Sequence, residues 1–460
     1  MSQLDAVLAH IDDNLDASLE RLFAFLRIAS ISTDPAHRDE CRRAAEHVRA
    51  ELAGLGFTAD VHATPGHPVV LGATAGRADT RVLFYGHYDV QPVDPLELWN
   101  TQPFEPQLET LADGSKLIRA RGAADDKGQI LTFLEAVRAW KAVTGALPVG
   151  VTVLIEGEEE VGSVNLPAFV DAHLENLRAD AVLVCDTNRW DDDTPAITTG
   201  LRGLVHDEIV IRTADRDLHS GLFGGAAQNA VHVLAQVIAA LREADGRIAV
   251  PGFYEGVPEV PEDVRAQWRG LGLDAQTFLG PVGLSVPAGE KDRDVIEQIQ
   301  SRPAFDINGI IGGYTGEGSK TVIPAEASAK ITFRLVGDQN PANVRDAFRA
   351  FVRRLIPADA SVTFGSGDGA PAVSVPLDSP WLAKASRALA DEWGRRPVTI
   401  GGGGSIPIIA TLKHALGAEP LLVGFGLEDD RIHSPNEKYT LKSFHKGARS
   451  WARILQALAE

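Results

Sequence analysis

Acidic and histidine side chains follow several apolar runs of this sequence, and each run is typical of a β-strand. These side chains offer oxygen and imidazole donors without thiolates, which is the donor set that hard or borderline divalent cations prefer. Together they predict a hydrolytic site that holds two metal ions. The residues are His87 and Asp89 in YGHYDVQ, Asp125 and Asp126 in RGAADDKGQ, Glu158 to Glu160 in EGEEEVGS, Asp186 in VLVCDTN and His433 in RIHSPNE.

His87 and Asp89 are separated by one residue, so on a strand they point to the same face. Asp89 is then placed to accept the second ring N–H of His87, as carboxylates beside metal-binding histidines commonly do. The alternative is an ordinary hydrogen-bonded histidine at a strand end. The neighbouring acidic clusters favour the metal site.

Asp125 and Asp126 lie in a glycine-bounded turn before a predicted helix. A carboxylate in this turn is placed to bridge two cations, while Lys127 offsets negative charge. An aspartate that caps the helix N-terminus is the alternative, and it suits Asp126.

Three consecutive glutamates, Glu158 to Glu160, follow the apolar run VTVLI. Their mutual repulsion is costly unless cations or solvent offset it. Their place at a strand end favours one glutamate as a metal ligand and its neighbour as a general base, with a solvated charged loop as the alternative. Asp186 ends another strand and His433 lies far along the chain, so the sequence leaves open whether these two meet the others.

The predicted elements explain how these residues can be gathered. Helical periodicity spans 4–28 and 42–55, and strands then alternate with helices. Such alternation is typical of an α/β domain around a largely parallel sheet, where ligands bind beyond the carboxyl ends of the strands. The alternating segments are strands at 81–85, 149–155 and 181–184 and helices at 129–142 and 166–177.

The pattern changes at about residue 201. From there the sequence predicts an α+β unit with strands in HDEIVIRTA and ASAKITFRLVG and at 360–364, helices at 226–242 and 341–355, and a Pro- and Gly-rich stretch at 250–289. From about residue 375 the α/β pattern returns. We therefore expect a discontinuous first domain, 1–200 and 375–460, with a second domain, 201–374, inserted into it.

Composition limits the function classes. The 460 residues carry a formal net charge of -19, which argues against a nucleic-acid or anionic-membrane surface. No signal-like or membrane-spanning apolar stretch is evident, so we expect a cytoplasmic protein. Cys41 and Cys185 are the only cysteines and cannot supply a disulfide framework, and Cys185 should be buried in a strand.

Motifs along nearly the whole chain resemble those of the M20 metallopeptidases, nearest to cytosolic, non-specific dipeptidases of the carnosinase type. The motifs are LFYGHYDVQP, GAADDKG, EGEEEVGS, DLHSG at 217–221, KTVIPAE, GGGSIP and HSPNE. The resemblance implies a zinc-peptidase-like α/β catalytic domain, with a mostly parallel sheet and helices on both faces, and an inserted α+β domain that serves as lid and dimer contact.

The resemblance also implies roles for individual residues. His87 and Asp186 would bind one divalent ion, Glu160 and His433 a second, and Asp125 would bridge them; Zn²⁺ is the first expectation and Mn²⁺ or Co²⁺ the alternatives. Glu159, aligned by the following VGS, would be the general base that activates a metal-bridged water, and Asp89 would be a further residue of the catalytic centre. His219 would stabilise charge on the substrate, from the same subunit or the partner of a homodimer. Thr321, Arg334, Gly404 and Ser405 would bind substrate.

The expected activity is hydrolysis of dipeptides or short peptides, of the dipeptidase or metallocarboxypeptidase type. An aminoacylase or desuccinylase that cleaves N-acyl amino acids is the alternative, because the lid selects the substrate of a shared metal centre. A two-metal phosphoesterase would need more basic groups near the clusters. A metal-dependent binding protein would be expected to lack the general base, which Glu159 supplies here.

Overall fold

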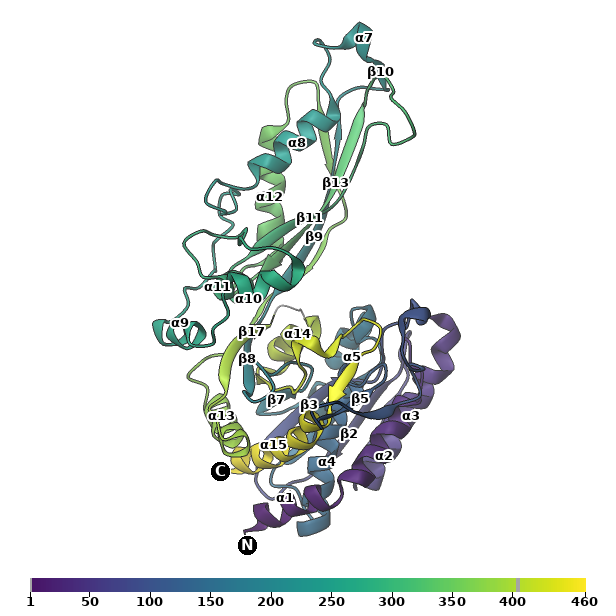
Figure 1. Ribbon diagram of the computed structural model, residues 1–460, viewed down its shortest axis with the longest axis vertical. Coiled ribbons are helices and arrows are strands. Elements are labelled where there is room, and N and C mark those ends of the chain that lie inside the picture. Colours follow the sequence, from purple (N-terminus) through teal and green to yellow (C-terminus); the bar gives the residue numbers. More distant parts are fainter. Residues whose placement is uncertain (1, 403–405) are drawn as a thin grey trace. The chain divides into compact units, whose positions relative to one another are not determined.

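The computed structural model describes residues 2–402 and 406–460. The chain divides into two compact units, and many of their elements are labelled in Figure 1. The first unit comprises Met1–Thr199, Val375–Ile400 and Ile406–Glu460, and the second comprises Gly200–Ser374 with a short segment that begins at Gly401. Among the described residues, no helix is long and apolar enough to cross a membrane.

A central sheet forms the core of the first unit, with the strand order β1-β2-β6-β3-β7-β18-β8-β16 and with β17 pairing with β8. The neighbours β6, β3, β7 and β18 run parallel, while antiparallel pairs flank them. The prediction of a mostly parallel sheet is therefore confirmed. The strands are β1 (Thr58–His62), β2 (Val69–Thr74), β3 (Arg81–His87), β6 (Gly150–Glu156), β7 (Ala181–Val184), β8 (Ala196–Leu201), β16 (Val373–Ser374), β17 (Val398–Gly402) and β18 (Glu419–Leu422).

Helix α4 is apolar around most of its circumference, and it is buried accordingly. Phe133 of α4 stacks on Phe84 of β3 with 3.8 Å between ring centroids, and Trp451 of α15 meets both rings edge-on. These contacts fix the helix that follows Asp125. The helices of this unit are α1 (Gln3–Asp13), α2 (Leu15–Leu26), α3 (Arg38–Gly54), α4 (Lys127–Thr144), α5 (Leu166–Ala172), α6 (Leu174–Leu177), α13 (Pro380–Trp393), α14 (Pro407–Leu416) and α15 (Leu441–Ala459).

A small antiparallel sheet, β4-β5-β19, also belongs to the first unit. Its strands are β4 (Gln107–Thr110), β5 (Lys116–Arg119) and β19 (Lys438–Thr440). Lys438 of β19 pairs with Arg119 of β5. The segment that follows β5 therefore begins beside the segment that precedes β19, although more than 300 residues separate them in the sequence.

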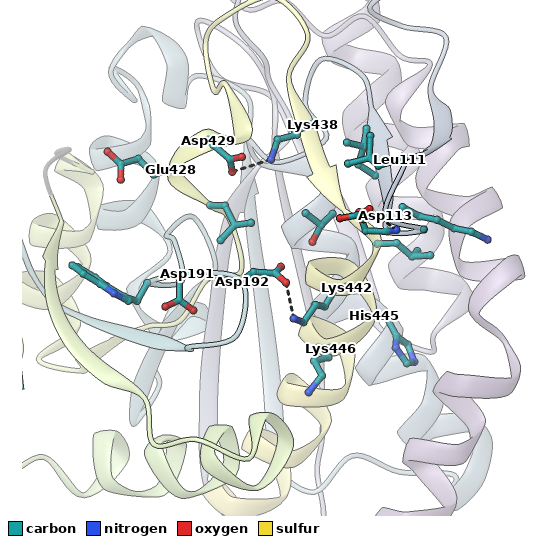
Figure 2. A pocket seen from close by; sticks show the side chains of 18 of the residues that line it. Leu111, Asp113, Asp191, Asp192, Glu428, Asp429, Lys438, Lys442, His445 and Lys446 are labelled. Carbon is teal, nitrogen blue, oxygen red and sulfur yellow. Dashed lines mark hydrogen bonds and ion pairs between the residues drawn. The ribbon is translucent and has the colours of Figure 1, made fainter. Parts of the chain in front are cut away.

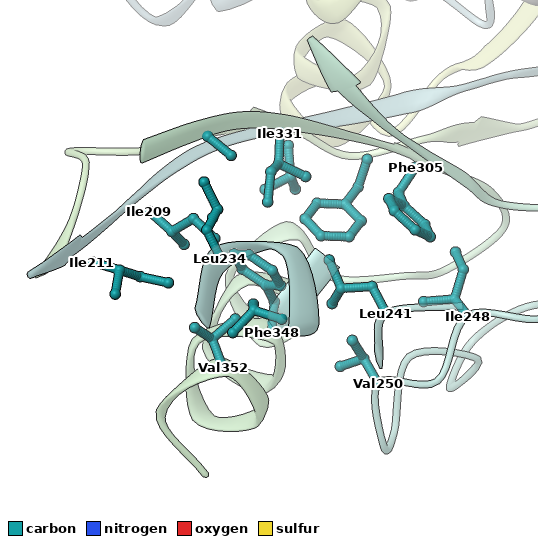
Figure 3. Close-up of a cluster of buried hydrophobic side chains, with 14 of the residues drawn as sticks. Ile209, Ile211, Leu234, Leu241, Ile248, Val250, Phe305, Ile331, Phe348 and Val352 are labelled. Carbon is teal, nitrogen blue, oxygen red and sulfur yellow. The ribbon is translucent and has the colours of Figure 1, made fainter. Parts of the chain in front are cut away.

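The second unit is a five-stranded sheet packed with helices. Strand order is β11-β13-β9-β14, with β15 also paired to β9. Figure 3 shows the core, in which Leu234 of α8 and Phe348 of α12 pack against sheet residues such as Ile331. The elements are β9 (Gly203–Arg212), β10 (Leu218–His219), α7 (Ser220–Phe223), α8 (Ala230–Ala240), α9 (Glu262–Arg269), α10 (Ala275–Leu279), α11 (Val295–Gln300), β11 (Ala304–Gly312), β12 (Val322–Ile323), β13 (Glu326–Leu335), α12 (Pro341–Leu355), β14 (Ser361–Phe364) and β15 (Asp368–Ala370).

Some helix boundaries differ from the predicted ones. The helix expected over 4–28 is divided at Asn14, whose non-helical backbone separates α1 from α2. The helix expected over 166–177 is likewise divided at His173. The helix expected from Ala226 begins at Ala230, because the side chain of Asn229 accepts a hydrogen bond from the Val231 N–H and caps it.

Candidate metal centre

The ends of three adjacent parallel strands carry the predicted ligands. His87 is the last residue of β3, the three glutamates follow β6 closely, and Asp186 lies two residues beyond β7. Because β6, β3 and β7 are parallel neighbours, their carboxyl ends meet at one edge of the sheet. Asp125 lies two residues before the first residue of α4.

The side chains form two groups of possible metal donors that share Asp125. One group is His87, Asp125 and Asp186, and the other is Asp125, Glu160 and His433. Within each group the donor atoms all lie within 4.8 Å of one another. His87 Nε2 lies 3.0 Å from Asp125 Oδ1, and His433 Nε2 lies 2.9 Å from Asp125 Oδ2.

Charge in this cluster favours a bound cation. Burial raises the pKa of Asp186 to about 7, and the Asp125 carboxylate adds to the increase. Burial also raises the pKa of Glu159 well above its usual range, with further repulsion from Asp186 and Asp125. Hydrogen bonds to Asp125 and Glu160 raise the pKa of His433 to about 10. These raised pKa values mean that the negative charge of the cluster favours bound protons. Divalent cations can replace those protons. The donor set fits such ions.

Asp89 contacts both His87 and the backbone of the glutamate segment. His87 Nδ1 lies 3.1 Å from the backbone oxygen of Asp89 and 3.4 Å from its carboxylate, so the ring lies closer to the backbone oxygen than to the carboxylate that the sequence suggested as its partner. The same carboxylate accepts hydrogen bonds from the backbone N–H groups of Glu159 (3.3 Å) and Glu160 (3.1 Å). Asp89 therefore connects the His87 strand end to the glutamate segment.

The three glutamates differ in their partners. Both carboxylate oxygens of Glu158 accept hydrogen bonds from Asn165 Nδ2, at 3.0 and 2.9 Å. Glu160 lies in a metal group and accepts a 2.7 Å hydrogen bond from Gln91 Nε2. Among these three glutamates, Glu160 alone belongs to a group of possible metal donors. Gln91 was not singled out in the sequence, although it lies in the YGHYDVQ motif.

Asp126 and Lys127 behave differently from their sequence interpretations. Asp126 occupies the N-cap position of α4 but makes no side-chain capping bond. Its carboxylate accepts the His87 backbone N–H at 3.2 Å instead. Lys127 Nζ donates to the Ile28 carbonyl at 2.6 Å and lies over the ring of Phe25, rather than pairing with a site carboxylate. Burial lowers the pKa of Lys127 to about 7.

The predicted residues of the second unit lie at two places. His219 is exposed on β10, which pairs with β12, and the Ser220 N–H donates to the Thr321 carbonyl. Arg334 is half-buried near the far end of β13, where it pairs with Leu204. Gly404 and Ser405 lie outside the described residues.

A separate cavity of about 980 Å³ lies in the first unit and is shown in Figure 2. Its charged side chains pair with one another, as in the Asp192–Lys442 contact at 2.7 Å and the Asp429–Lys438 contact at 2.9 Å. Among the described residues that line it, none belongs to the two metal groups. The cavity and the metal centre are therefore distinct features.

A mostly parallel α/β sheet with two overlapping groups of oxygen and imidazole donors beyond its carboxyl edge is typical of metal-dependent hydrolases. Comparison with protein families narrows this class. Residues 83–457 match the model of peptidase family M20/M25/M40. The chain belongs to this family and is a metallopeptidase.

The sequences of two curated relatives align with almost the full length of this chain. The chain is 31% identical to the Cys-Gly metallodipeptidase DUG1 of Candida albicans over 453 residues, covering 94% of this chain and 92% of the relative. It is 29% identical to the Beta-Ala-His dipeptidase of Homo sapiens over 483 residues, covering 99% and 93%.

Solved structures show the same architecture. Human carnosine dipeptidase 1 matches with a TM-score of 0.78 and 27% identity, covering 100% of this chain and 99% of that one. The M20 metallo-carboxypeptidase Sso-CP2 from Sulfolobus solfataricus matches with a TM-score of 0.81 and 29% identity, covering 96% and 99%.

Proposed function

We propose that this protein is a hydrolase of dipeptides or short peptides that depends on two divalent ions, with Zn²⁺ the first expectation and Mn²⁺ or Co²⁺ the alternatives. The observation that carries the proposal is the pair of donor groups that share Asp125, beside Glu159. The names of the relatives, a Cys-Gly metallodipeptidase and a Beta-Ala-His dipeptidase, support the substrate class.

The proposed ligands are His87 and Asp186 in one group, Glu160 and His433 in the other, and Asp125 in both. Ions bound there would lower the pKa of a water molecule and polarise the peptide carbonyl. Two imidazoles and three carboxylates suit Zn²⁺, Mn²⁺ or Co²⁺, so the donor set alone does not select among these ions.

Glu159 is the proposed general base. Its carboxylate takes a proton from the attacking water as the new C–O bond forms, and it returns the proton to the amine as the C–N bond breaks. Glu159 is placed for this role because it directly precedes Glu160, which belongs to one of the donor groups. Asp89 fixes the backbone of Glu159 and thereby orients it.

Substrate binding is assigned to the second unit and to Gly404 and Ser405. Arg334 is suited to pair bidentately with the terminal carboxylate of a peptide. Thr321 is also proposed to bind substrate, and His219 to stabilise the charge that develops on the carbonyl oxygen.

The positions of these residues support a homodimer. His219 and Thr321 lie beside β12, just before Glu326, whereas Arg334 is eight residues further along β13. At about 3.3 Å per residue this separates them by roughly 26 Å, much more than the length of a dipeptide. We propose that one copy supplies His219 and Thr321 while its partner supplies Arg334.

Strand β11 supports the same assembly. It forms an edge of the five-stranded sheet, and its residues Ile310 and Ile311 are exposed. An apolar edge strand of this kind is usually covered by a partner. Size-exclusion chromatography with light scattering tests the proposal, and a fully active monomer would overturn it.

The activity is tested with a panel of dipeptides beside N-acetyl and N-succinyl amino acids, using protein stripped with a chelator and then supplied with Zn²⁺, Mn²⁺ or Co²⁺. Metal-restored cleavage of dipeptides is the expected result. Cleavage of the acyl amino acids alone would reassign the protein as an aminoacylase or desuccinylase.

A further inference from the structure

Glu437 has an unusually complete set of hydrogen-bond donors. Its side chain is fully buried. Oε2 accepts from Arg121 Nη1 at 2.8 Å and from the Gly122 N–H at 3.0 Å, while Oε1 accepts from the Ala124 N–H at 2.9 Å and the Asp125 N–H at 3.1 Å. The carboxylate thus binds almost the whole segment that leads to Asp125.

The backbone of this segment is shaped to surround an anion. Gly122 has a φ of +82°, and an added Cβ there would lie 2.9 Å from Val90 Cγ1, so a larger residue would be both strained and crowded. Successive N–H groups that converge in such a turn form an anion-binding concavity. Here the anion is the Glu437 side chain, and it fixes the backbone of Asp125.

Glu437 also ends the segment that carries His433. Within this segment His433 has a φ of +62° and Asn436 a φ of +67°, both in the left-handed region that non-glycine residues rarely adopt. The Asn436 side chain accepts from the Asn100 N–H at 2.7 Å and donates to the Leu98 carbonyl at 2.8 Å. Asn436 and Glu437 therefore fix one end of the segment, and Glu437 connects it to Asp125.

We propose that Glu437 is a positioning residue that fixes the spacing between Asp125 and His433 and thereby sets the divalent-cation affinity of the Asp125–Glu160–His433 group. The proposal rests on the proposed function in taking this group to hold a metal ion. Hydrogen bonds to a carboxylate are short and directional, and their loss would leave buried N–H groups of the ligand segment without acceptors.

Glu437→Gln is the informative substitution because the side chain keeps its size. An amide offers one acceptor oxygen and one donor NH₂ group. Whichever way the amide is turned, its NH₂ group faces donors, either Arg121 and Gly122 or Ala124 and Asp125. The two segments should then separate or shift without a cavity being created.

Glu135→Gln is the matched control. Glu135 is also a buried glutamate of the first unit that accepts from an arginine, Arg21, but its hydrogen-bond partners, Ser18, Arg21 and Arg138, are not in the two metal groups. A general loss of stability would affect both variants, whereas a role in metal positioning would affect Glu437→Gln alone.

The experiment measures Zn²⁺ affinity of the stripped full-length protein by competition with a chromophoric chelator, and the visible absorption of the Co²⁺-loaded form. For Glu437→Gln we expect the affinity of the more affected site to fall about 10- to 100-fold and the Co²⁺ spectrum to change. For Glu135→Gln the Zn²⁺ affinity and the Co²⁺ spectrum should equal those of the wild type. Wild-type affinity and spectrum in Glu437→Gln would overturn the proposal.

A second variant keeps the test decisive if Glu437→Gln does not fold. Arg121→Lys keeps the positive charge but loses the guanidinium group, which donates to Glu437 from Nη1 and to the Pro92 carbonyl from Nη2. We expect a smaller loss of Zn²⁺ affinity, and unchanged affinity would count against the proposal. Failure of metal-loaded wild type to cleave any dipeptide would refute the proposed function alone, since the affinity comparison needs no turnover.

Discussion

Asp125 presents one carboxylate oxygen to each histidine of the site, with Oδ1 lying 3.0 Å from His87 Nε2 and Oδ2 lying 2.9 Å from His433 Nε2. These histidines come from segments about 350 residues apart. A single aspartate therefore joins the two donor groups, and substitutions at Asp125 and at His433 should have different effects on metal content.

Asp125→Ala should remove metal from both groups, whereas His433→Ala should weaken one group and leave the other. The reduction at the affected site should exceed the roughly 10- to 100-fold that loss of an outer hydrogen-bond partner causes. Metal per chain is measured by elemental analysis after dialysis against a weak chelator. Equal retention in both variants would show that Asp125 does not bridge.

Glu159→Gln should lower kcat by a factor of about 10²–10⁴, because it removes the group that moves the proton. Metal content should not change, since Glu159 belongs to neither donor group. Glu158→Gln is the control: its carboxylate is bonded to Asn165, and its substitution should affect kcat much less. A greater loss of kcat in Glu158→Gln than in Glu159→Gln would reverse the assignment.

Mixing His219→Ala with Glu159→Gln should restore activity if His219 acts on the partner's site. Each mixed dimer then contains one intact site, so a statistical mixture should reach about a quarter of the wild-type rate. Subunit exchange is verified with two affinity tags. No recovery in verified mixed dimers would place His219 in the same subunit as the Glu159 it serves.

Glu135→Gln should lower the free energy of unfolding by about 1–3 kcal/mol at pH 7. Burial opposes ionisation of Glu135, but the guanidinium groups of Arg21 and Arg138 outweigh it and lower its pKa. Because the folded pKa lies below the unfolded value of about 4.3, this stabilisation is present above that pH and is lost as the pH falls through the folded pKa.

Denaturant titrations of metal-free protein at pH 7 and near pH 4 measure this effect. The difference between wild type and Glu135→Gln should shrink at the lower pH. Glu46→Gln is the control, because Glu46 forms an exposed pair with Arg49 and should contribute little at either pH. A difference that is equally large at both pH values would contradict the account.

The sequence was sufficient to predict the strand ends that carry His87, the glutamates and Asp186, because parallel strands bring their carboxyl ends together. It could not show that His433 reaches the same place. That depends on the antiparallel pairing of β19 with β5, a contact between short strands with no sequence pattern linking them.

Hydrogen bonds between distant segments were equally difficult to predict. The contacts of Asp89 with the Glu159 and Glu160 N–H groups, and of Glu437 with the segment before Asp125, depend on backbone conformation after folding. Lys127 shows the same limitation: its sequence neighbours suggested that it offsets the negative charge of the site, but its long side chain reaches the Ile28 carbonyl, just after helix α2, instead.

Reconstitution of activity against bound metal tests the central claim most directly. Stripped protein is titrated with Zn²⁺ while hydrolysis of the best dipeptide and metal per chain are followed, with Glu159→Gln treated in parallel. The account predicts no hydrolysis without metal, full activity once both donor groups are filled, and normal metal uptake with strongly reduced hydrolysis in Glu159→Gln. Undiminished hydrolysis by the stripped protein, or by Glu159→Gln, would contradict it.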